Sequence, residues 1–243
     1  MNISDLKQKI KKNDRLKRTV HYLIMNQRGS CPRLWVKWFV NPFMLTYGKR
    51  SKIRRSAIMN VSPINSFILG QESIIEHYVT IDNGVGHVHI GDHSRIGIHN
   101  TIIGPVFIGN QVILAQNITI SGLNHTYHDI SKPIVKQGIT TSPVIIEDES
   151  WIGANTVITS GVHIGKHCVI GAGSVVTKDI PDYSVAVGNP AKVVKHYDPC
   201  GQQWKRTRSK GSMRFLKMIT FRIKTGYLIG MEILVGIPPV LSS

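Results

Sequence analysis

The most regular feature of the chain is an aliphatic side chain at every sixth position in two long blocks. The first block runs through Ile90, Ile96, Ile102, Ile108, Leu114 and Ile120, and the second through Ile146, Ile152, Ile158, Ile164, Ile170 and Val176. Gly or Ala often follows the aliphatic residue, and a small or β-branched residue often stands four positions after it. A period of six fits neither an α-helix, which repeats about every 3.6 residues, nor a single strand, whose side chains alternate.

This period is typical of hexapeptide β-helices, in which three short strands and three turns close one triangular coil. The same type of side chain then returns 18 residues later, so Ile152 should stack on Ile170 and Ile146 on Ile164. The aliphatic residue points inward, and the small residue follows at a corner, where a larger side chain would collide. We therefore expect an all-β fold, a left-handed parallel β-helix over residues 61–197.

The period is interrupted at two places. Three extra residues stand between Ile81 and Ile90, which predicts a small irregular insertion there. Between Ile120 and Ile146 the chain has 20 residues more than the period needs, so residues 122–143 should leave the solenoid as a loop. Long excursions from a regular scaffold are usually functional, and this loop is the first place to look for chemistry.

The N-terminal segment, residues 1–60, reads as basic and helical. Apolar residues mixed with Lys and Arg predict an amphipathic helix over 4–27, followed by the aromatics Trp35, Trp38, Phe39, Phe43 and Tyr47. Two interpretations of this segment stay open. It could cap the open end of the solenoid, or its aromatic and cationic side chains could contact a membrane surface.

The C-terminal extension, residues 198–243, is also basic. A short hairpin or strand is expected at 199–208, whereas residues 211–243 fit a strand, an interfacial helix or a subunit contact equally well. The most apolar stretch, 227–240, is too short and too interrupted to cross a bilayer, which takes about 20 apolar residues. The lysine-rich start lacks the apolar core of a secretory signal.

Charge is unevenly distributed along the chain. Residues 1–60 hold 15 Lys and Arg against 2 acids, residues 61–190 hold 5 against 10, and residues 191–243 hold 10 against 2. Basic ends indicate an anionic partner, such as a membrane leaflet, a phosphorylated substrate or nucleic acid. No recognised nucleic-acid motif is present, so we do not expect a nucleic-acid partner.

The cysteines Cys31, Cys168 and Cys200 are few, odd in number and without motif spacing. This pattern argues against a disulfide scaffold and against a cysteine metal site, and it favours a reducing compartment. The expected location is the cytoplasm, with peripheral contact at the inner membrane face if the basic ends touch lipid.

Three runs in the second block carry a family resemblance. Trp151–Asn155, Gly171–Pro181 and Gly188–Val193 resemble the hexapeptide acyltransferases, which include maltose, galactoside, serine and polysaccharide O-acetyltransferases. The ends of the chain look like a bacterial subgroup associated with capsule or lipopolysaccharide genes. The resemblance implies a homotrimer with active sites between neighbouring subunits, and direct acyl transfer from acetyl-CoA without a resident metal.

The resemblance also implies residues that contact coenzyme A. By position these are Ala154, Ala172, Thr177, Lys178, Lys192 and Lys195. The two alanines would offer backbone N–H groups to the pantetheine arm, as the edge of a sheet does to a peptide. The lysines would hold the nucleotide phosphates, although Lys cannot form the bidentate contact that Arg can.

The catalytic residue that the resemblance implies is His125, because the family places its histidine just after the strand that opens this loop. Imidazole titrates near neutrality, so it can take the proton of an acceptor hydroxyl as that oxygen attacks the thioester. Asn124 is a candidate donor to the oxyanion, and His128 is either a second base or an acceptor contact. Asn100 is either a substrate contact or a buried amide that binds the backbone of the coils.

These features predict an acetyl-CoA-dependent O-acetyltransferase that acts on a sugar hydroxyl of a cell-surface polysaccharide precursor. A lipid-linked precursor would give the basic ends an evident use. Two alternatives stay open. One is N-acetylation of an amino sugar, and the other is a carbonic-anhydrase-like β-helix hydratase with zinc on His89, His125 and His128.

Overall fold

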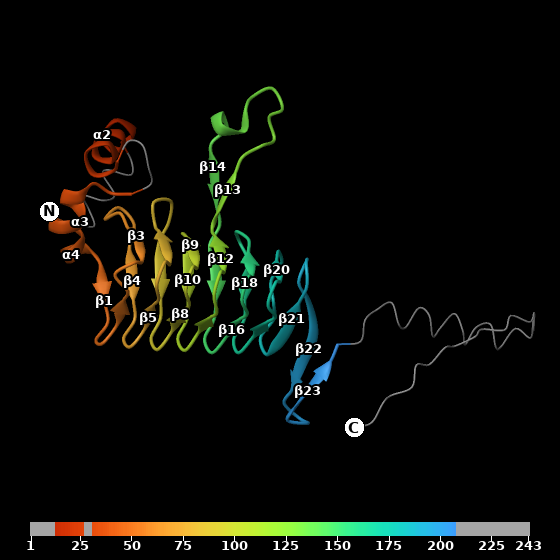
Figure 1. The fold of residues 1–243 in the computed structure, drawn as a ribbon. Coiled ribbons are helices and arrows are strands. Elements are labelled where there is room, and N and C mark those ends of the chain that lie inside the picture. Colours follow the sequence, from red (N-terminus) through yellow and green to blue (C-terminus); the bar gives the residue numbers. More distant parts are fainter. Residues whose placement is uncertain (1–12, 27–30, 208–243) are drawn as a thin grey trace, which may run out of the picture. The chain divides into compact units, whose positions relative to one another are not determined.

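The computed structural model describes residues 13–26 and 31–207, and it shows a parallel β-solenoid of six coils (Figure 1). Each coil contributes one strand to each of three faces. The chain divides into two compact units, residues 1–206 and 207–243, and almost all of the second lies outside the described residues. The solenoid, its loops and the helices all belong to the first unit.

The three faces are parallel sheets in which every strand pairs with its counterpart in the next coil. The first face consists of β1 (Thr46–Tyr47), β4 (Phe67–Leu69), β7 (Val88–Ile90), β10 (Val106–Ile108), β15 (Val144–Ile146) and β18 (His163–Ile164). The second begins with β2 (Lys52–Ile53), β5 (Ile74–Ile75), β8 (Arg95–Ile96), β11 (Ile113–Leu114), β16 (Trp151–Ile152) and β19 (Val169–Ile170). The third consists of β3 (Ile58–Asn60), β6 (Thr80–Asp82), β9 (Thr101–Ile103), β12 (Thr119–Ser121), β17 (Val157–Ile158) and β20 (Val175–Val176).

The core is the aliphatic column that the period predicted. Ile152 pairs with Ile170 and Ile146 with Ile164, and all four side chains are buried. The small residues after them are required by close approach: a Cβ on Gly153 would lie 2.6 Å from the backbone nitrogen of Ala172. The predicted stacking is therefore confirmed, and it holds the corners of successive coils in contact.

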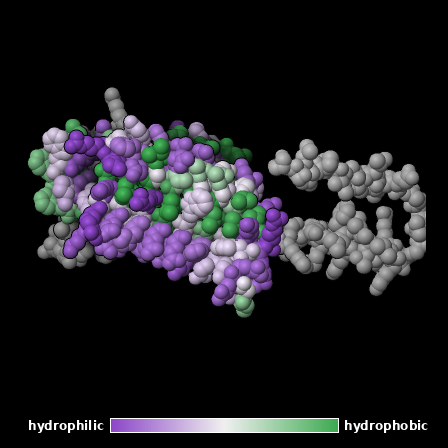
Figure 2. All heavy atoms as spheres, turned by 60° about the horizontal axis from the view of Figure 1, so that its bottom comes forward, coloured by the Kyte–Doolittle hydropathy of each residue, from purple (hydrophilic) through white to green (hydrophobic). Residues whose placement is uncertain are grey.

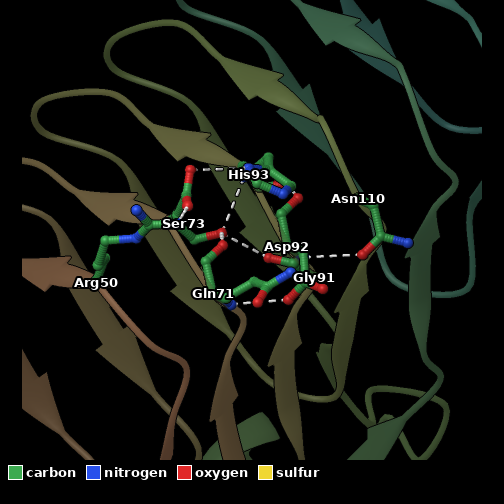
Figure 3. Close-up of polar contacts among 9 residues, drawn as sticks. Arg50, Gln71, Ser73, Gly91, Asp92, His93 and Asn110 are labelled. Carbon is green, nitrogen blue, oxygen red and sulfur yellow. Dashed lines mark hydrogen bonds and ion pairs between the residues drawn. The ribbon is translucent and has the colours of Figure 1, made fainter.

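The corner between the first and second faces is closed by a ladder of side-chain hydrogen bonds (Figure 3). The N–H of Gln71 donates to Asp92 Oδ1 at 2.7 Å, and the N–H of Asp92 donates to Asn110 Oδ1 at 2.8 Å. The same bond recurs from Asn110 to Asp148 at 2.7 Å. In the second, third and fourth coils the residue after the corner glycine thus has its N–H satisfied by an Asp or Asn of the next coil.

The first coil lies inside the segment that the sequence presented as helical. Strands β1, β2 and β3 occupy 46–60 and pair with β4, β5 and β6. The helices before this coil are α2 (Asp14–Ile24), α3 (Leu34–Phe39) and α4 (Asn41–Met44). The structure therefore replaces the C-terminal part of the expected helical segment with one more turn of solenoid.

The helices pack on the beginning of the solenoid, as the capping interpretation expected. Val36 of α3 is fully buried among Ile24, Met25 and Ile64, the last of which belongs to the loop after the first coil. Asn41 Nδ2 donates to the carbonyl oxygen of Val61 at 2.8 Å. Within the ranges that the structure describes, no helix has the length and apolar character needed to cross a bilayer.

At the other end the second face continues into antiparallel strands. β21 (Ser184–Val187) follows β19 and pairs with β22 (Lys192–Asp198), which pairs with β23 (Gln203–Arg206). The strand expected within 199–208 is therefore present. The segment 211–243, which the sequence left open, lies outside the described residues.

Candidate active site

The long excursion between the fourth and fifth coils is a hairpin that projects from the corner between the third and first faces (Figure 1). Its strands are β13 (Leu123–His125) and β14 (Ile139–Thr141), and its tip contains a 3-10 turn, η1 (Ile134–Lys136). His125 pairs with Ile139 and is exposed. Among the described residues no hydrogen bond engages its imidazole, so both ring nitrogens are open to a substrate.

The base of this hairpin is held firmly on the solenoid. Ser142 N–H donates to the Gly122 carbonyl at 2.9 Å, and Ser160 Oγ donates to the same oxygen at 3.0 Å. A Cβ on Gly122 would lie 2.5 Å from the carbonyl oxygen of Pro105, so only glycine allows this approach. The strand that carries His125 therefore leaves the solenoid in a fixed direction.

A groove of about 420 Å³ lies beside the hairpin base. Its walls come from α2, from the loops after the first and second coils, and from β9 and β13: His21, Met25, Ser62, Ile64, Asp82, Gly84, Val85, Ile103 and Leu123. Side chains two residues apart on a strand share a face, so His125 lies on the face of β13 that carries Leu123. Because Leu123 lines the groove, the groove adjoins the strand face that carries the candidate base.

Asp82 is the acidic group in this groove, and sequence reasoning missed it. Its Oδ1 accepts from the N–H of Gly84 at 2.7 Å, and the described residues provide no partner for its other oxygen. That oxygen can accept a hydrogen bond from a hydroxyl in the groove. The three extra residues that follow Ile81 in the sequence were the signal that this coil is modified.

Asn124, the candidate oxyanion donor, and His128, the candidate second base or acceptor contact, both lie away from the imidazole of His125 within this chain. The pleat of β13 turns Asn124 to the opposite face from His125, where it pairs with Thr140. His128 is exposed beyond the strand, and its ring packs against Tyr127 with centroids 4.6 Å apart. Within this chain neither residue is positioned as the oxyanion donor or second base of His125.

Asp129 does not orient His125 either. Its carboxylate accepts from Ser131 Oγ at 2.5 Å and from Lys132 Nζ at 2.6 Å. The hydrogen bond from Lys132, followed by those from Ser131, lowers the pKa of Asp129. Asp129 therefore stabilises the tip of the hairpin as an anion.

Asn100 is a structural residue rather than a substrate contact. Its side chain is fully buried; Nδ2 donates to the Ala115 carbonyl at 2.8 Å, and Oδ1 accepts from the Ile118 N–H at 2.7 Å. A residue without exposed surface cannot touch an acceptor from outside the solenoid. Of the two interpretations, the buried amide that binds coil backbone is the one that the geometry favours.

The corner between the second and third faces is open, in contrast to the ladder in Figure 3. Ala154 and Ala172 stand directly after the corner glycines, as Gln71 and Asp92 do at the closed corner. Neither alanine N–H donates a hydrogen bond among the described residues, because no Asp or Asn of the next coil reaches it. Two unsatisfied N–H groups therefore lie in a row along this edge.

The other residues implied for coenzyme A lie near the C-terminal end of the solenoid. Thr177 and Lys178 are exposed directly after β20, and Lys192 and Lys195 are exposed on β22, opposite Val187 and Val185. They surround the last coil, whereas His125 belongs to the hairpin after the fourth. A ligand that reached both groups would lie lengthwise along the solenoid.

The three histidines of the zinc alternative are not brought together. His89 lies on β7, where its Nε2 is 2.6 Å from Ser66 Oγ and its ring meets Phe107 edge-on. Burial, and then the nearby His87, lowers the pKa of His89. In the part of the chain that the structure describes, no group of three or more His, Cys, Asp or Glu side chains could hold a metal ion.

Comparison with known proteins places the chain among relatives of this architecture. A family model described as the hexapeptide repeat of succinyl-transferase matches residues 143–178. YJL218W of Saccharomyces cerevisiae (strain ATCC 204508 / S288c), named as an acetyltransferase, is 36% identical over 64% of this chain and 84% of its own length. WbbJ of Escherichia coli (strain K12), named as a lipopolysaccharide biosynthesis O-acetyl transferase, is 30% identical over 51% of this chain and 67% of its own length.

Other curated relatives match part of the chain, and a solved structure shares its fold. Three other curated relatives, 36–38% identical, match over only 53–62% of their own length. A mutant of AntD, an N-acyltransferase from Bacillus cereus solved with dTDP-4-amino-4,6-dideoxyglucose and coenzyme A, superposes with a TM-score of 0.55 at 18% identity, covering 76% of this chain and 94% of that chain. That likeness is one of fold. With the repeat, the solenoid and the coverage of YJL218W in hand, the chain belongs to the hexapeptide-repeat acetyltransferase family.

Proposed function

We propose that the protein transfers an acetyl group from acetyl-CoA to a sugar hydroxyl of a cell-surface polysaccharide precursor, with His125 as general base. Membership of the acetyltransferase family supports the reaction class, and the name of WbbJ supports an acceptor of the polysaccharide type. The site that we propose for the acceptor is the groove beside β13, where Asp82 accepts from a sugar hydroxyl. The reaction takes place in the cytoplasm, where acetyl-CoA is available.

In the proposed reaction a single imidazole first accepts a proton and later returns it. His125 removes the proton of the acceptor hydroxyl as the oxygen attacks the thioester carbonyl. The tetrahedral intermediate then collapses, the C–S bond breaks, and the imidazolium returns the proton to the leaving thiolate. The acetyl group ends as an ester on the sugar and the coenzyme as a free thiol, so no metal or acyl-enzyme is required.

The observation that carries this proposal is the position of His125. The longest excursion from the described solenoid presents its imidazole without a partner, on the strand face that adjoins the groove. The test is release of free thiol from acetyl-CoA in the presence of candidate sugars, followed by mass spectrometry of the product. Alkali-labile acetyl on a hydroxyl supports O-transfer; acetyl on an amine would instead select the amino-sugar alternative.

The open corner between the second and third faces is the proposed binding edge for the pantetheine arm. Gly173 has φ +71°, so Ala172 occupies the position before a left-handed residue, where turns accept proline. Ala172→Pro therefore removes one N–H with little strain. We expect the Kd for coenzyme A to rise about fivefold to tenfold, which corresponds to the loss of one hydrogen bond. Isothermal titration calorimetry measures this Kd.

The matched control for Ala172→Pro is Ile98→Pro, the equivalent position three coils earlier, before His99 at φ 58°. This variant removes an N–H from the same corner, away from the last two coils. It should bind coenzyme A as the parent does. Equal weakening by both substitutions would mean that proline disturbs the corner itself, and the binding edge would have to lie elsewhere.

The proposed assembly is a homotrimer in which the hairpin of one copy meets the coenzyme edge of the next. In one chain, the strand of His125 leaves the corner between the third and first faces, whereas the N–H groups of Ala154 and Ala172 lie at the corner between the second and third faces, which supports a site completed by a second copy. The side in Figure 2 shows hydrophobic residues in a broken band along the solenoid. The first face also holds a hollow of about 440 Å³, lined in part by Ile68, Phe107 and Ile145.

Mixed trimers test this arrangement. We expect His125→Ala and Ala172→Pro/Lys178→Glu chains to be inactive or weak alone, because each lacks one half of every site. Co-expressed with different affinity tags and purified through both, the mixed trimers should recover about a third of parental activity, since one of the three neighbour pairs in each is intact. Trimers that recover nothing would place both halves of the site in the same chain.

A further inference from the structure

The helical segment carries five large apolar side chains that are exposed to solvent. They are Leu34, Trp35, Trp38, Phe39 and Phe43, which together we name the aromatic face. Trp38 is 72% exposed and Phe43 is 86% exposed, so these rings lie almost wholly in solvent. Burying such rings is strongly favourable, and an exposed cluster of them indicates a binding surface.

The aromatic face cannot turn inward to bury itself. Val36 and Val40 lie on the opposite side of α3, and Val36 is fully buried against α2 and the loop after the first coil. The Asn41 amide donates to the Val61 carbonyl at 2.8 Å, which fixes the start of α4 on the solenoid. One side of α3 thus packs on the beginning of the solenoid, and the opposite side faces solvent.

The surroundings of the aromatic face are strongly cationic. In the described residues 13–26 and 31–60 there are ten Lys and Arg and one acidic residue. Two of the arginines, Arg50 and Arg54, form ion pairs with Glu72 and Glu76 of the second coil. Lys37 lies on α3 itself, between Trp35 and Trp38 in the sequence, and within the described residues it forms no ion pair with an acidic side chain. The excess of Lys and Arg over acidic residues in this segment favours an anionic partner.

We infer that the aromatic face docks the protein on an anionic lipid surface. Trp and Phe side chains insert at the boundary between headgroups and acyl chains, and neighbouring cations attract the headgroup phosphates. The helices stand at the beginning of the solenoid (Figure 1), so this end can meet a flat bilayer while the hairpin stays on the flank. This inference does not rest on the proposed reaction, because it concerns residues outside that site.

The test is co-sedimentation of the full chain with vesicles of phosphatidylcholine alone and of phosphatidylcholine with phosphatidylglycerol. We expect binding to the mixed vesicles, weakened by raised ionic strength. Trp38→Ser/Phe43→Ser should bind at least tenfold more weakly. The control, Tyr78→Ser/Ile113→Ser, removes side chains that are 57% and 50% exposed on the solenoid and should bind as the parent does.

Several outcomes would overturn the inference. Equal binding of the parent to neutral and mixed vesicles would remove the role of charge, and unchanged binding of the Trp38→Ser/Phe43→Ser protein would remove the role of the aromatic face. A third outcome comes from sedimentation without lipid, which measures the size of the assembly. If Trp38→Ser/Phe43→Ser forms a smaller assembly than the parent and the control, the aromatic face is a contact between copies of the chain. Circular dichroism and melting temperature, unchanged in the variant, exclude unfolding as the cause of weaker binding.

Discussion

His125→Ala should abolish turnover while leaving the solenoid, its assembly and its affinity for acetyl-CoA intact. General base catalysis contributes about 10²–10⁴-fold to a rate. The imidazole that lines the groove, His21, lies on α2 and not on β13, so we do not expect it to replace His125. The exposed side chain of His125 takes no part in the core, so its loss costs little stability. The measurement is the initial rate of thiol release, with calorimetry for the coenzyme.

The matched control is His128→Ala, three residues further along the same hairpin. Its ring packs only against Tyr127 and is exposed, so we expect less than about a tenfold change in rate. The pair separates a catalytic role from general damage to the loop. Parental turnover in His125→Ala would contradict the mechanism. A larger loss of rate in His128→Ala than in His125→Ala would identify His128 as the base.

The pH profile adds a readout that a structural role would not change. An imidazole must be neutral to accept a proton, so the parental rate should fall at acidic pH. The residual rate of His125→Ala should lack that limb. A variant that keeps the same acidic limb would show that another group controls it.

The sequence predicted the solenoid because the repeat is a local physical requirement. An inward aliphatic side chain and a small corner residue must recur wherever coils stack, and each can be read from a single position. The first coil was missed although Tyr47, Ile53 and Met59 keep the period of six. Lys and Arg at five of the positions between 46 and 60 made this stretch read as a solvated basic segment.

The two corners could also have been distinguished from sequence. At the closed corner the second residue after the inward aliphatic one is repeatedly an Asp or Asn, as in Asp92, Asn110 and Asp148. At the open corner it is Ala154 or Ala172, which has no acceptor to offer its neighbour. The side chain at this position therefore decides whether the N–H of the preceding coil is hydrogen-bonded within the fold or stays available to a ligand.

The candidate groove could not be predicted, because its walls are distant in the chain. His21 and Met25 reach it only through the packing of α2 on the solenoid, and Leu123 reaches it only because Gly122 fits against Pro105. No short-range pattern encodes these contacts.

Ile152→Ala should cost about 2–5 kcal/mol of the free energy of unfolding, the usual loss for a large aliphatic side chain in a core. Ile152 is fully buried and lies between Leu114 and Ile170, so truncation leaves a cavity in the middle of the column. The coils above and below are closed by their own hydrogen bonds and cannot collapse into it. Urea unfolding of the full chain, followed by circular dichroism, gives the change.

The matched control is Ile113→Ala, the same substitution on the same sheet with the side chain pointing outward. Ile113 is 50% exposed and precedes the buried Leu114, so its loss should change stability by no more than about 0.5 kcal/mol. Equal losses would deny the inward and outward alternation on which the solenoid depends. The stability lost in Ile113→Ala could instead increase when the protein is diluted. A stability that depends on protein concentration indicates a subunit interface. That result would place the outer side of β11 between copies of the chain.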